Sequence, residues 1–135
     1  MDPYHITELY GSSGNELKAA QLAVQHLRNN VFEEVSDGNS LRNLSWWLGE
    51  LFDRTPSENE RPVVQWIVST LENYPQFDEV KGNDIAYWYG WLYDHTSSRS
   101  REEYQTVERI INLLENNPQF DEVNGNDIDW WRSRF

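Results

Sequence analysis

An internal repeat dominates the sequence. Residues 71–88 have the sequence LENYPQFDEVKGNDIAYW, and residues 114–131 have the sequence LENNPQFDEVNGNDIDWW. Fourteen of these eighteen positions are identical at an offset of 43 residues. A more diverged copy lies upstream, where residues 46–55 (WWLGELFDRT) match residues 87–96 (YWYGWLYDHT). A period of this length predicts an array of similar units, in which each unit buries its apolar face against the next one.

Three capping boxes, spaced 44 and 43 residues apart, mark the expected starts of the repeats. A Ser followed three residues later by a Glu satisfies two free N–H groups at a helix start. The pair occurs as Ser13/Glu16, Ser57/Glu60 and Ser100/Glu103, and Pro62 favours a later start for the second of these helices. We expect a single domain over residues 1–135, with an N-terminal cap over residues 1–12 and repeats over residues 13–56, 57–99 and 100–135.

Each repeat is expected to contain two helices. The first has apolar residues at i, i+3, i+4 and i+7, and a proline follows it in copies two and three. The second opens at Ser40, Asp84 or Asp127, which are favourable N-cap residues. The first-helix positions are Ala20, Ala23, Val24 and Leu27; Val64, Ile67, Val68 and Leu71; and Val107, Ile110, Ile111 and Leu114. The second-helix positions are Leu44, Trp47, Leu48 and Leu51; Ile85, Trp88, Tyr89 and Leu92; and Ile128 and Trp131.

These patterns predict an all-α fold of three tandem two-helix repeats (α-hairpins) of about 43–44 residues, stacked as a short solenoid with a truncated last repeat. The period resembles that of HEAT-type two-helix repeats, about 40–47 residues. The resemblance concerns the repeat architecture and implies no function.

Composition excludes several classes of function. The chain has no Cys, which removes disulfide scaffolds, Cys-ligated zinc, iron–sulfur clusters and thiol catalysis. No apolar run is long enough to cross a membrane, and the start of the chain lacks the features of a secretory signal, so we expect a cytoplasmic protein. With 23 acidic and 11 basic residues, the net charge of −12 argues against direct nucleic-acid binding and against anionic membranes. It favours a basic protein partner.

The repeated loop FDEV-x-GND has two interpretations, and both stay open. In the first, its residues only build a turn: Phe32, Phe77 and Phe120 and the following valines pack at the base, Gly38, Gly82 and Gly125 permit the turn, and Asn and Asp cap the next helix. In the second, equivalent loops lie on one edge and form an acidic surface. Its carboxylates are those of Glu33, Glu34, Asp78, Glu79, Asp121 and Glu122. A calcium site in this loop is the weaker alternative, because the ligand spacing does not match an EF-hand.

Aromatic residues of the second helices form two sets. Trp47, Trp88 and Trp131 fall on the predicted core stripe. Their neighbours lie about 100° further round the helix. These neighbours either pack against the next repeat or stay partly exposed as anchors for a partner, because Trp and Tyr are enriched at interface hot spots. The candidate anchors are Trp46, Tyr87, Trp91 and Trp130.

No catalytic constellation is evident. His95 lies between Asp94 and Thr96, but the first copy has Arg54 at the equivalent position, which indicates a surface residue rather than a base. Repeated carboxylates in turns are a poor catalytic pattern, and no phosphate-binding or zinc motif occurs. We expect no enzymatic activity, no cofactor and no metal.

The sequence therefore predicts a non-enzymatic, acidic protein-binding module. Proteins that bind nucleic acids, nucleases among them, are the largest natural class of basic surfaces. An inhibitor, an immunity-type protein or an anti-defence protein that imitates the charge of DNA fits the size and charge of the chain. Two alternatives remain. One is a scaffold that self-associates as a homo-oligomer through its aromatic face, and the other is a receptor for a small ligand or peptide with a groove lined by Trp46, Tyr87 and Trp91.

Overall fold

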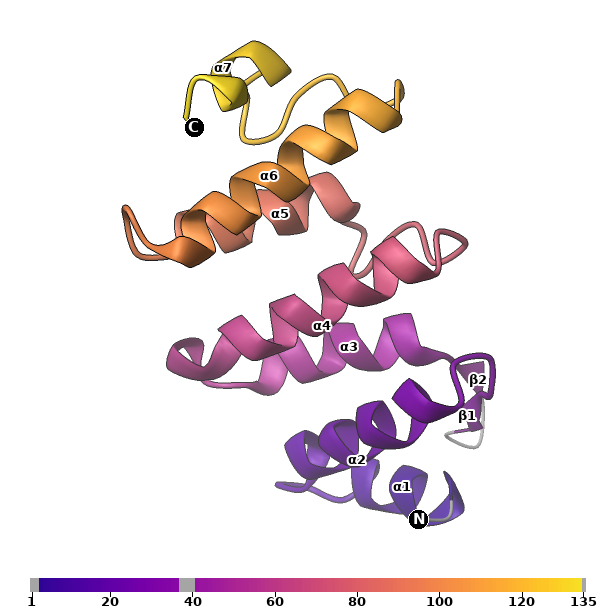
Figure 1. Ribbon diagram of the computed structural model, residues 1–135. Helices are drawn as coiled ribbons and strands as arrows, with labels where there is room; N and C mark the ends of the chain where they lie inside the picture. Colours follow the sequence, from indigo (N-terminus) through magenta and orange to yellow (C-terminus); the bar gives the residue numbers. More distant parts are fainter. Residues whose placement is uncertain (1–2, 37–40, 135) are drawn as a thin grey trace. The chain divides into compact units, whose positions relative to one another are not determined.

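The chain is mostly helical, which confirms the all-α class (Figure 1). The computed structural model describes residues 3–36 and 41–134, and these contain seven α-helices, one 3-10 turn and one short antiparallel strand pair. The helices are α1 (Pro3–Tyr10), α2 (Glu16–Asn29), α3 (Leu44–Arg54), α4 (Glu60–Asn73), α5 (Ile85–Asp94), α6 (Arg101–Asn116) and α7 (Ile128–Arg132). The strands are β1 (Val35–Ser36) and β2 (Leu41–Arg42), and the 3-10 turn is η1 (Ser57–Asn59).

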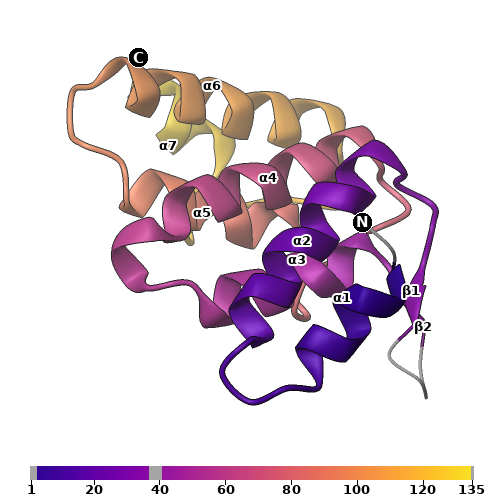
Figure 2. The ribbon, with the colours of Figure 1, turned by 90° about the horizontal axis from the view of Figure 1, so that it is seen from below.

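The chain divides into two compact units, residues 1–70 and 71–135, with the division inside α4. In the first unit, α1 and α3 both pack against α2 (Figure 2). The core of this unit is built from the predicted apolar positions of α2 and α3, together with Ile6 of α1 and Val35 of β1. Its largest buried side chain is Trp47, which is fully inaccessible to solvent.

In the second unit, α6 packs against α5 and α7. The apolar stripe of α6 is buried at Val107, Ile110 and Ile111, as the periodicity predicts. The rings of Tyr93 and Trp131 meet edge to face, with their centroids 4.8 Å apart. Trp88 and Trp131 are fully buried, so the predicted assignment of the aromatic core stripe is correct in this unit as well.

The FDEV-x-GND loop forms the same tight hairpin in copies two and three. Val80 and Asn83 exchange two backbone hydrogen bonds of 2.9 and 3.0 Å, and Val123 and Asn126 exchange two of 3.0 Å. The two residues between each pair all have positive φ, from 55° at Asn124 to 77° at Gly82. Such a turn requires the left-handed region at both central positions, which explains the glycine and the small or polar residue before it.

The first copy departs from the predicted loop. Its hairpin pairs β1 with β2, and the following helix is capped by Asn43, whose side chain accepts a hydrogen bond from the backbone N–H of Trp46. The predicted start at Ser40 is therefore wrong, and the loop is four residues longer than in copy two. Val35 lies eight residues before Asn43, the N-cap of α3, whereas Val80 lies four residues before Asp84, the N-cap of α5. Ser40 and Gly38 lie outside the described residues.

Phe32 does not pack at the base of its hairpin, contrary to the prediction, because 69% of its surface is exposed. The turn after α2 is closed by a bond from Glu33 N–H to Asn30 C=O, whereas the turn after α4 is closed from Phe77 N–H to Tyr74 C=O. The first copy has one residue fewer between this turn and the buried valine, so its motif begins one residue earlier and Phe32 occupies the outward position that Gln76 occupies in copy two. Val35 still reaches the core.

Of the three predicted capping boxes, the one at Ser100 forms, with its return bond going to Arg99 N–H rather than to the N–H of Ser100. The Ser100 side chain accepts a hydrogen bond of 3.1 Å from Glu103 N–H, and the Glu103 carboxylate accepts one of 3.2 Å from Arg99 N–H. The predictions at Ser13 and Ser57 are wrong, because α2 begins after Asn15 and Ser57 lies in η1, ahead of α4. Asp84 and Asp127 cap their helices as predicted.

Candidate protein-binding surface

The acidic pairs of the second unit, Asp78/Glu79 and Asp121/Glu122, are exposed. In the parts of the chain that the structure describes, none of these four carboxylates forms a hydrogen bond or an ion pair. The neighbouring Asp84 and Asp127 behave differently, since each accepts a bond from a backbone N–H, at 3.1 and 3.0 Å. Asp84 and Asp127 therefore have a structural role as helix caps, whereas the acidic pairs have no such role in the turn.

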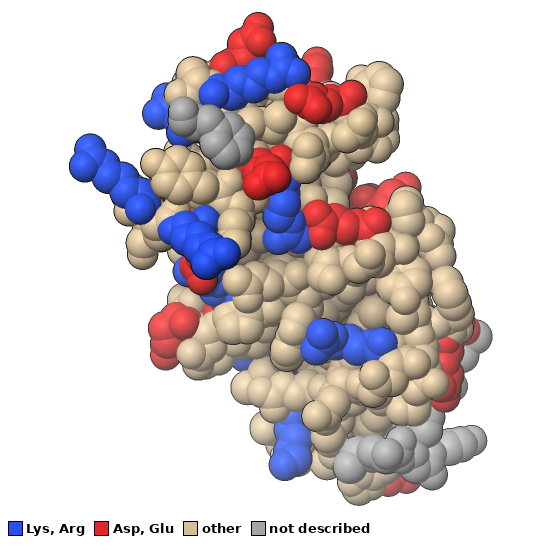
Figure 3. Space-filling view, viewed as in Figure 1, with Lys and Arg blue, Asp and Glu red and all other residues tan. Residues whose placement is uncertain are grey.

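Both loops of the second unit border one groove. Its volume is about 330 Å³, and it lies between the end of α4, α5 and α6. The first loop contributes Pro75 and Asp78, and the second contributes Gln119 and Phe120, which directly precede the second acidic pair. Figure 3 shows carboxylates of this unit on the side of the loop that follows α4 and basic side chains toward the α5–α6 connection. The groove thus has an acidic border.

An ion pair with a tyrosine forms one wall of this groove. Arg109 donates two hydrogen bonds to the Glu72 carboxylate, from Nη2 at 2.5 Å and from Nε at 3.2 Å, and the Tyr89 hydroxyl donates to the same carboxylate. Burial and then the Glu72 carboxylate raise the pKa of Tyr89 well above its ordinary value. Burial alone would lower the pKa of Arg109, but its bonds to Glu72 raise it, so the guanidinium remains charged. The charge of Glu72 is neutralised within the wall, and Asp78 supplies the unpaired charge of the lining.

This raised pKa predicts a loss of stability at high pH. Below pH 10, Tyr89 is neutral in both the folded and the unfolded chain, whose tyrosines have a pKa of about 10. Above it, the unfolded chain loses the proton while the folded chain retains it. The free energy of unfolding should fall by about 1 kcal/mol between pH 10 and pH 11. Urea titrations of wild type and Tyr89→Phe test this, and a slope that persists in the variant would contradict the assignment to Tyr89.

The aromatic residues singled out in the second unit differ in accessibility. Tyr87 is 50% exposed and meets the buried Trp88 edge to face at 5.0 Å. Trp91 is half-buried and stacks on the His95 imidazole, with 3.8 Å between ring centroids and 10° between planes. Trp130 is half-buried beneath the Arg134 guanidinium, 3.9 Å from the ring centroid. All three keep part of their surface accessible, and Tyr87 is the most open.

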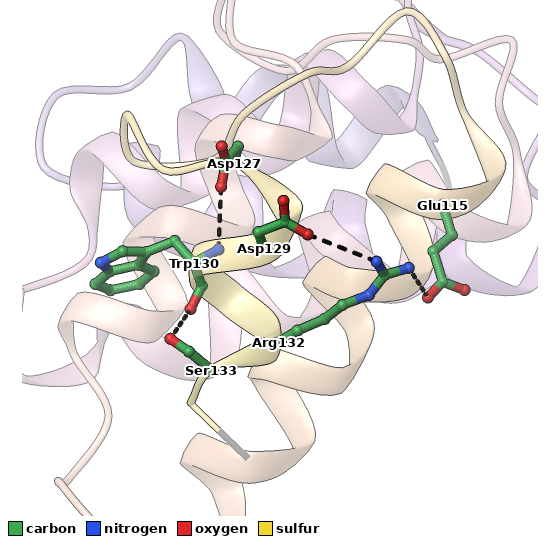
Figure 4. Close-up of polar contacts among 6 residues, drawn as sticks. All are labelled: Glu115, Asp127, Asp129, Trp130, Arg132 and Ser133. Carbon is green, nitrogen blue, oxygen red and sulfur yellow. Dashed lines mark hydrogen bonds and ion pairs between the residues drawn. The ribbon is translucent and has the colours of Figure 1, made fainter.

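Polar contacts around α7 hold the backbone at Trp130 (Figure 4). Asp127 caps the helix at Trp130 N–H, and Ser133 Oγ donates to the Trp130 carbonyl at 2.6 Å. On the other side of the helix, Arg132 bonds to Glu115 of α6 at 2.9 Å and lies 3.8 Å from Asp129. The Trp130 indole projects away from this ion pair, so α7 turns its charged side toward α6 and an aromatic side away from it.

The first unit holds the remaining candidate residues. Trp46 is half-buried, and its ring meets Tyr10 of α1 at 5.7 Å and Trp47 at 4.9 Å, both edge to face. Glu33 and Glu34 are exposed, and Glu33 Oε2 lies 3.1 Å from His26 Nε2. Trp46 therefore contributes to the contact between α1 and α3, and Glu34 most resembles the acidic residues of the second unit.

Sequence reasoning missed the groove and its Glu72–Arg109–Tyr89 wall. Tyr89 was placed on the core stripe, and it is indeed buried, but its hydroxyl reaches a carboxylate seventeen residues earlier in the chain. Arg109 occurs only in the third copy. The sequence alone does not show which carboxylate a cation on the polar face of a helix will bind. Neither this groove nor a second groove in the first unit is lined by Trp46, Tyr87 or Trp91.

Two further observations concern metals and membranes. Within residues 3–36 and 41–134, no group of three or more His, Asp or Glu side chains is placed to hold a metal ion, the FDEV-x-GND loops included. None of the helices in the same ranges combines the length and the apolar character that a bilayer span requires.

Comparison with known proteins adds no functional information. No protein-family model, no curated protein and no solved structure matches this chain.

Proposed function

We propose that the chain is a non-enzymatic protein-binding module whose acidic pairs engage a basic partner protein. The observation that carries the proposal is that Asp78, Glu79, Asp121 and Glu122 are exposed and form no hydrogen bond or ion pair with the described part of the chain. Backbone hydrogen bonds and left-handed residues hold the hairpins. Unpaired carboxylates in a chain of net charge −12 attract cationic surfaces and raise their association rate.

The proposal includes the repeat architecture. The three copies form tandem α-hairpins that stack as a short solenoid with a truncated last repeat, which brings equivalent loops to one edge. Support comes from the fourteen identities between copies two and three and from the shared geometry of their hairpins. In this proposal the groove of the second unit accepts an apolar side chain of the partner, and the partly exposed rings of Tyr87, Trp91 and Trp130 in the same unit supply aromatic contacts.

Such a module suits a partner whose basic surface binds nucleic acid. Occupying that surface with carboxylates and aromatic rings imitates the charge of DNA and blocks the partner's own ligand. We therefore propose an inhibitory role of the immunity or anti-defence type, exercised in the cytoplasm. The size of the chain and the excess of acidic over basic residues support this role.

Affinity capture with charge-matched variants tests the proposal. The loop variant carries Asp78→Asn, Glu79→Gln, Asp121→Asn and Glu122→Gln. The control variant carries Glu8→Gln, Glu58→Gln, Glu102→Gln and Glu108→Gln, which neutralise four exposed carboxylates outside the loops. From a lysate of the source cells, wild type and control should retain the same basic protein, and the loop variant should bind it about tenfold more weakly, a loss of about 1.4 kcal/mol.

Salt dependence provides the second readout. Exposed charge pairs are screened over about 8 Å at physiological ionic strength. The affinity of wild type for the captured protein should therefore fall steeply as salt is raised. Equal retention by the loop variant and the control, or an affinity that is insensitive to salt, would exclude the acidic pairs as the binding surface.

A further inference from the structure

The first unit contains a groove of the opposite electrostatic character. Its volume is about 830 Å³, and it lies between α2 and residues 62–66 of α4, with Leu51 of α3 and the C-cap residue Thr55 also in its lining. Leu17, Leu22 and Trp66 line it and are only half-buried, so the fold leaves apolar surface accessible there. The volume falls in the range of ligand-binding clefts, about 300–1,000 Å³.

The lining of this groove is cationic in an otherwise acidic chain. Lys18 and Arg28 line it, and no carboxylate does. The Arg28 guanidinium lies 4.7 Å from the centroid of the Trp66 ring, which holds it at the groove. In the described residues neither cation forms an ion pair with a carboxylate, although the chain has 23 of them. In Figure 3 the surface over α2 is mostly uncharged and carries cationic side chains, with carboxylates toward its margins.

The polar residues of α2 that line the groove are regularly spaced. Lys18, Gln21, Gln25 and Arg28 stand at i, i+3, i+7 and i+10, which places them on one face of the helix. The two cations are ten residues apart, which corresponds to about 15 Å along the helix axis. The two glutamine amides stand between them, and Asn59 lines the groove from η1.

We infer that this groove binds an acidic peptide segment of a partner protein in extended conformation. Extended chain advances about 3.3 Å per residue and alternate side chains share one face, so carboxylates four residues apart, about 13 Å, match the two cations. The amides of Gln21 and Gln25 can pair with the backbone groups between those carboxylates, and alternate apolar side chains of the peptide contact Leu22 and Trp66. A long-chain fatty acid fits less well, because its single carboxylate leaves one cation and both amides without a partner.

The site is independent of the acidic pairs and of the function proposed for them. The acidic pairs lie in the other unit, and the peptide contacts only residues 17–66. The net negative charge repels an acidic peptide at long range, but this repulsion is screened beyond about 8 Å at physiological salt. Contacts inside the groove then decide the affinity.

Selection from a displayed library of random twelve-residue peptides tests the inference. The probes are wild type, the groove variant Lys18→Gln/Arg28→Gln, and the control variant Arg99→Gln/Arg101→Gln, which removes the same charge from exposed residues of the second unit. Enriched peptides should carry two carboxylates four or six residues apart, so that both face the groove, with apolar residues between them. By fluorescence anisotropy they should bind the groove variant at least tenfold more weakly, while the control variant and the loop variant stay within about twofold of wild type.

Four outcomes would overturn the inference. The first is a lack of enrichment, and the second is enrichment of neutral or basic peptides. The third is an unchanged affinity for the groove variant, whose exposed substitutions leave the core intact. The fourth is a different occupant: dodecanoate binding without any selected acidic peptide identifies an amphiphile site, and self-association in sedimentation that Lys18→Gln/Arg28→Gln abolishes identifies a second copy of the chain.

Discussion

Replacing Trp131 with alanine is expected to lower the free energy of unfolding of the second unit by about 3–5 kcal/mol. Trp131 is fully buried and packs edge to face on Tyr93. Its indole Nε1–H lies within hydrogen-bond distance of two loop carbonyls, Val123 at 3.2 Å and Asn126 at 3.1 Å. The substitution therefore removes a large core side chain and the indole donor, while each carbonyl keeps its backbone hydrogen bond across the hairpin. Urea unfolding followed by circular dichroism measures the loss.

Trp130→Ala is the matched control, because the same residue type is removed one position earlier. Trp130 is half-buried and contacts the Trp131 ring at 4.8 Å and the Arg134 guanidinium. Its loss should cost about 1 kcal/mol. Trp131→Phe keeps most of the packing and removes the indole donor, so it should fall between the two, at about 2 kcal/mol. Equal losses for Trp130→Ala and Trp131→Ala would contradict the division of the aromatic residues into a core set and a partly exposed set.

The core set of aromatic residues was predictable from the sequence, because it depends on helical periodicity alone. Trp47, Trp88 and Trp131 fall on the stripe that repeats with the other apolar residues, and all three are buried. The N-caps Asp84 and Asp127 were predictable for a related reason, since a cap bonds to a backbone N–H only three residues away. Interactions of this short range are encoded in the local sequence.

The structure departs from the sequence predictions where loop length or a competing local interaction sets the path of the backbone. The one-residue shortening before the first hairpin turns Phe32 outward, although its motif FEEV resembles FDEV. At Ser13 the following Gly14 has a φ of 86°, and its N–H bonds to the Glu16 carboxylate, so the chain enters α2 after Asn15 instead. A motif identifies the residue types that a cap or a turn needs, but it does not fix the backbone path on either side.

The candidate site was predictable in its charges but not in its shape. Exposure of the acidic pairs follows from their residue type. The groove beside them depends on Glu72, Tyr89 and Arg109, which come from three helices and are separated by up to 37 residues. Helix periodicity assigns each of them to a face of its helix, but it does not predict which side chains of different helices meet. The aromatic candidates show the same limit, because the imidazole of His95 and the guanidinium of Arg134 set the accessible area of Trp91 and Trp130.

Gly90→Ala is the second substitution expected to have a large effect, a destabilisation of about 2 kcal/mol. Gly90 is buried in α5, where a Cβ atom would lie 2.9 Å from Asn124 Cγ and closer still to its Oδ1. The Asn124 side chain would have to move and give up its hydrogen bonds to Gly90 C=O, 3.4 Å, and to the Asp94 carboxylate, 3.1 Å. In an unobstructed helix the same change would stabilise the protein by up to about 1 kcal/mol. Urea unfolding gives both the sign and the size of the effect.

A double-mutant cycle with Asn124→Gly isolates the contact. Asn124 has a φ of 55°, which glycine adopts readily, so this substitution removes the obstructing side chain without straining the turn. In the Asn124→Gly background, Gly90→Ala should be neutral or stabilising, which gives a coupling free energy of about 2 kcal/mol. Gly11→Ala is the control, because a Cβ atom there meets only ordinary contacts of 3.7 Å. Gly90→Ala could instead lower the free energy of unfolding equally in both backgrounds. The contact between Gly90 and Asn124 would then not be the cause of the destabilisation, and it would not hold the hairpin after α6 in place.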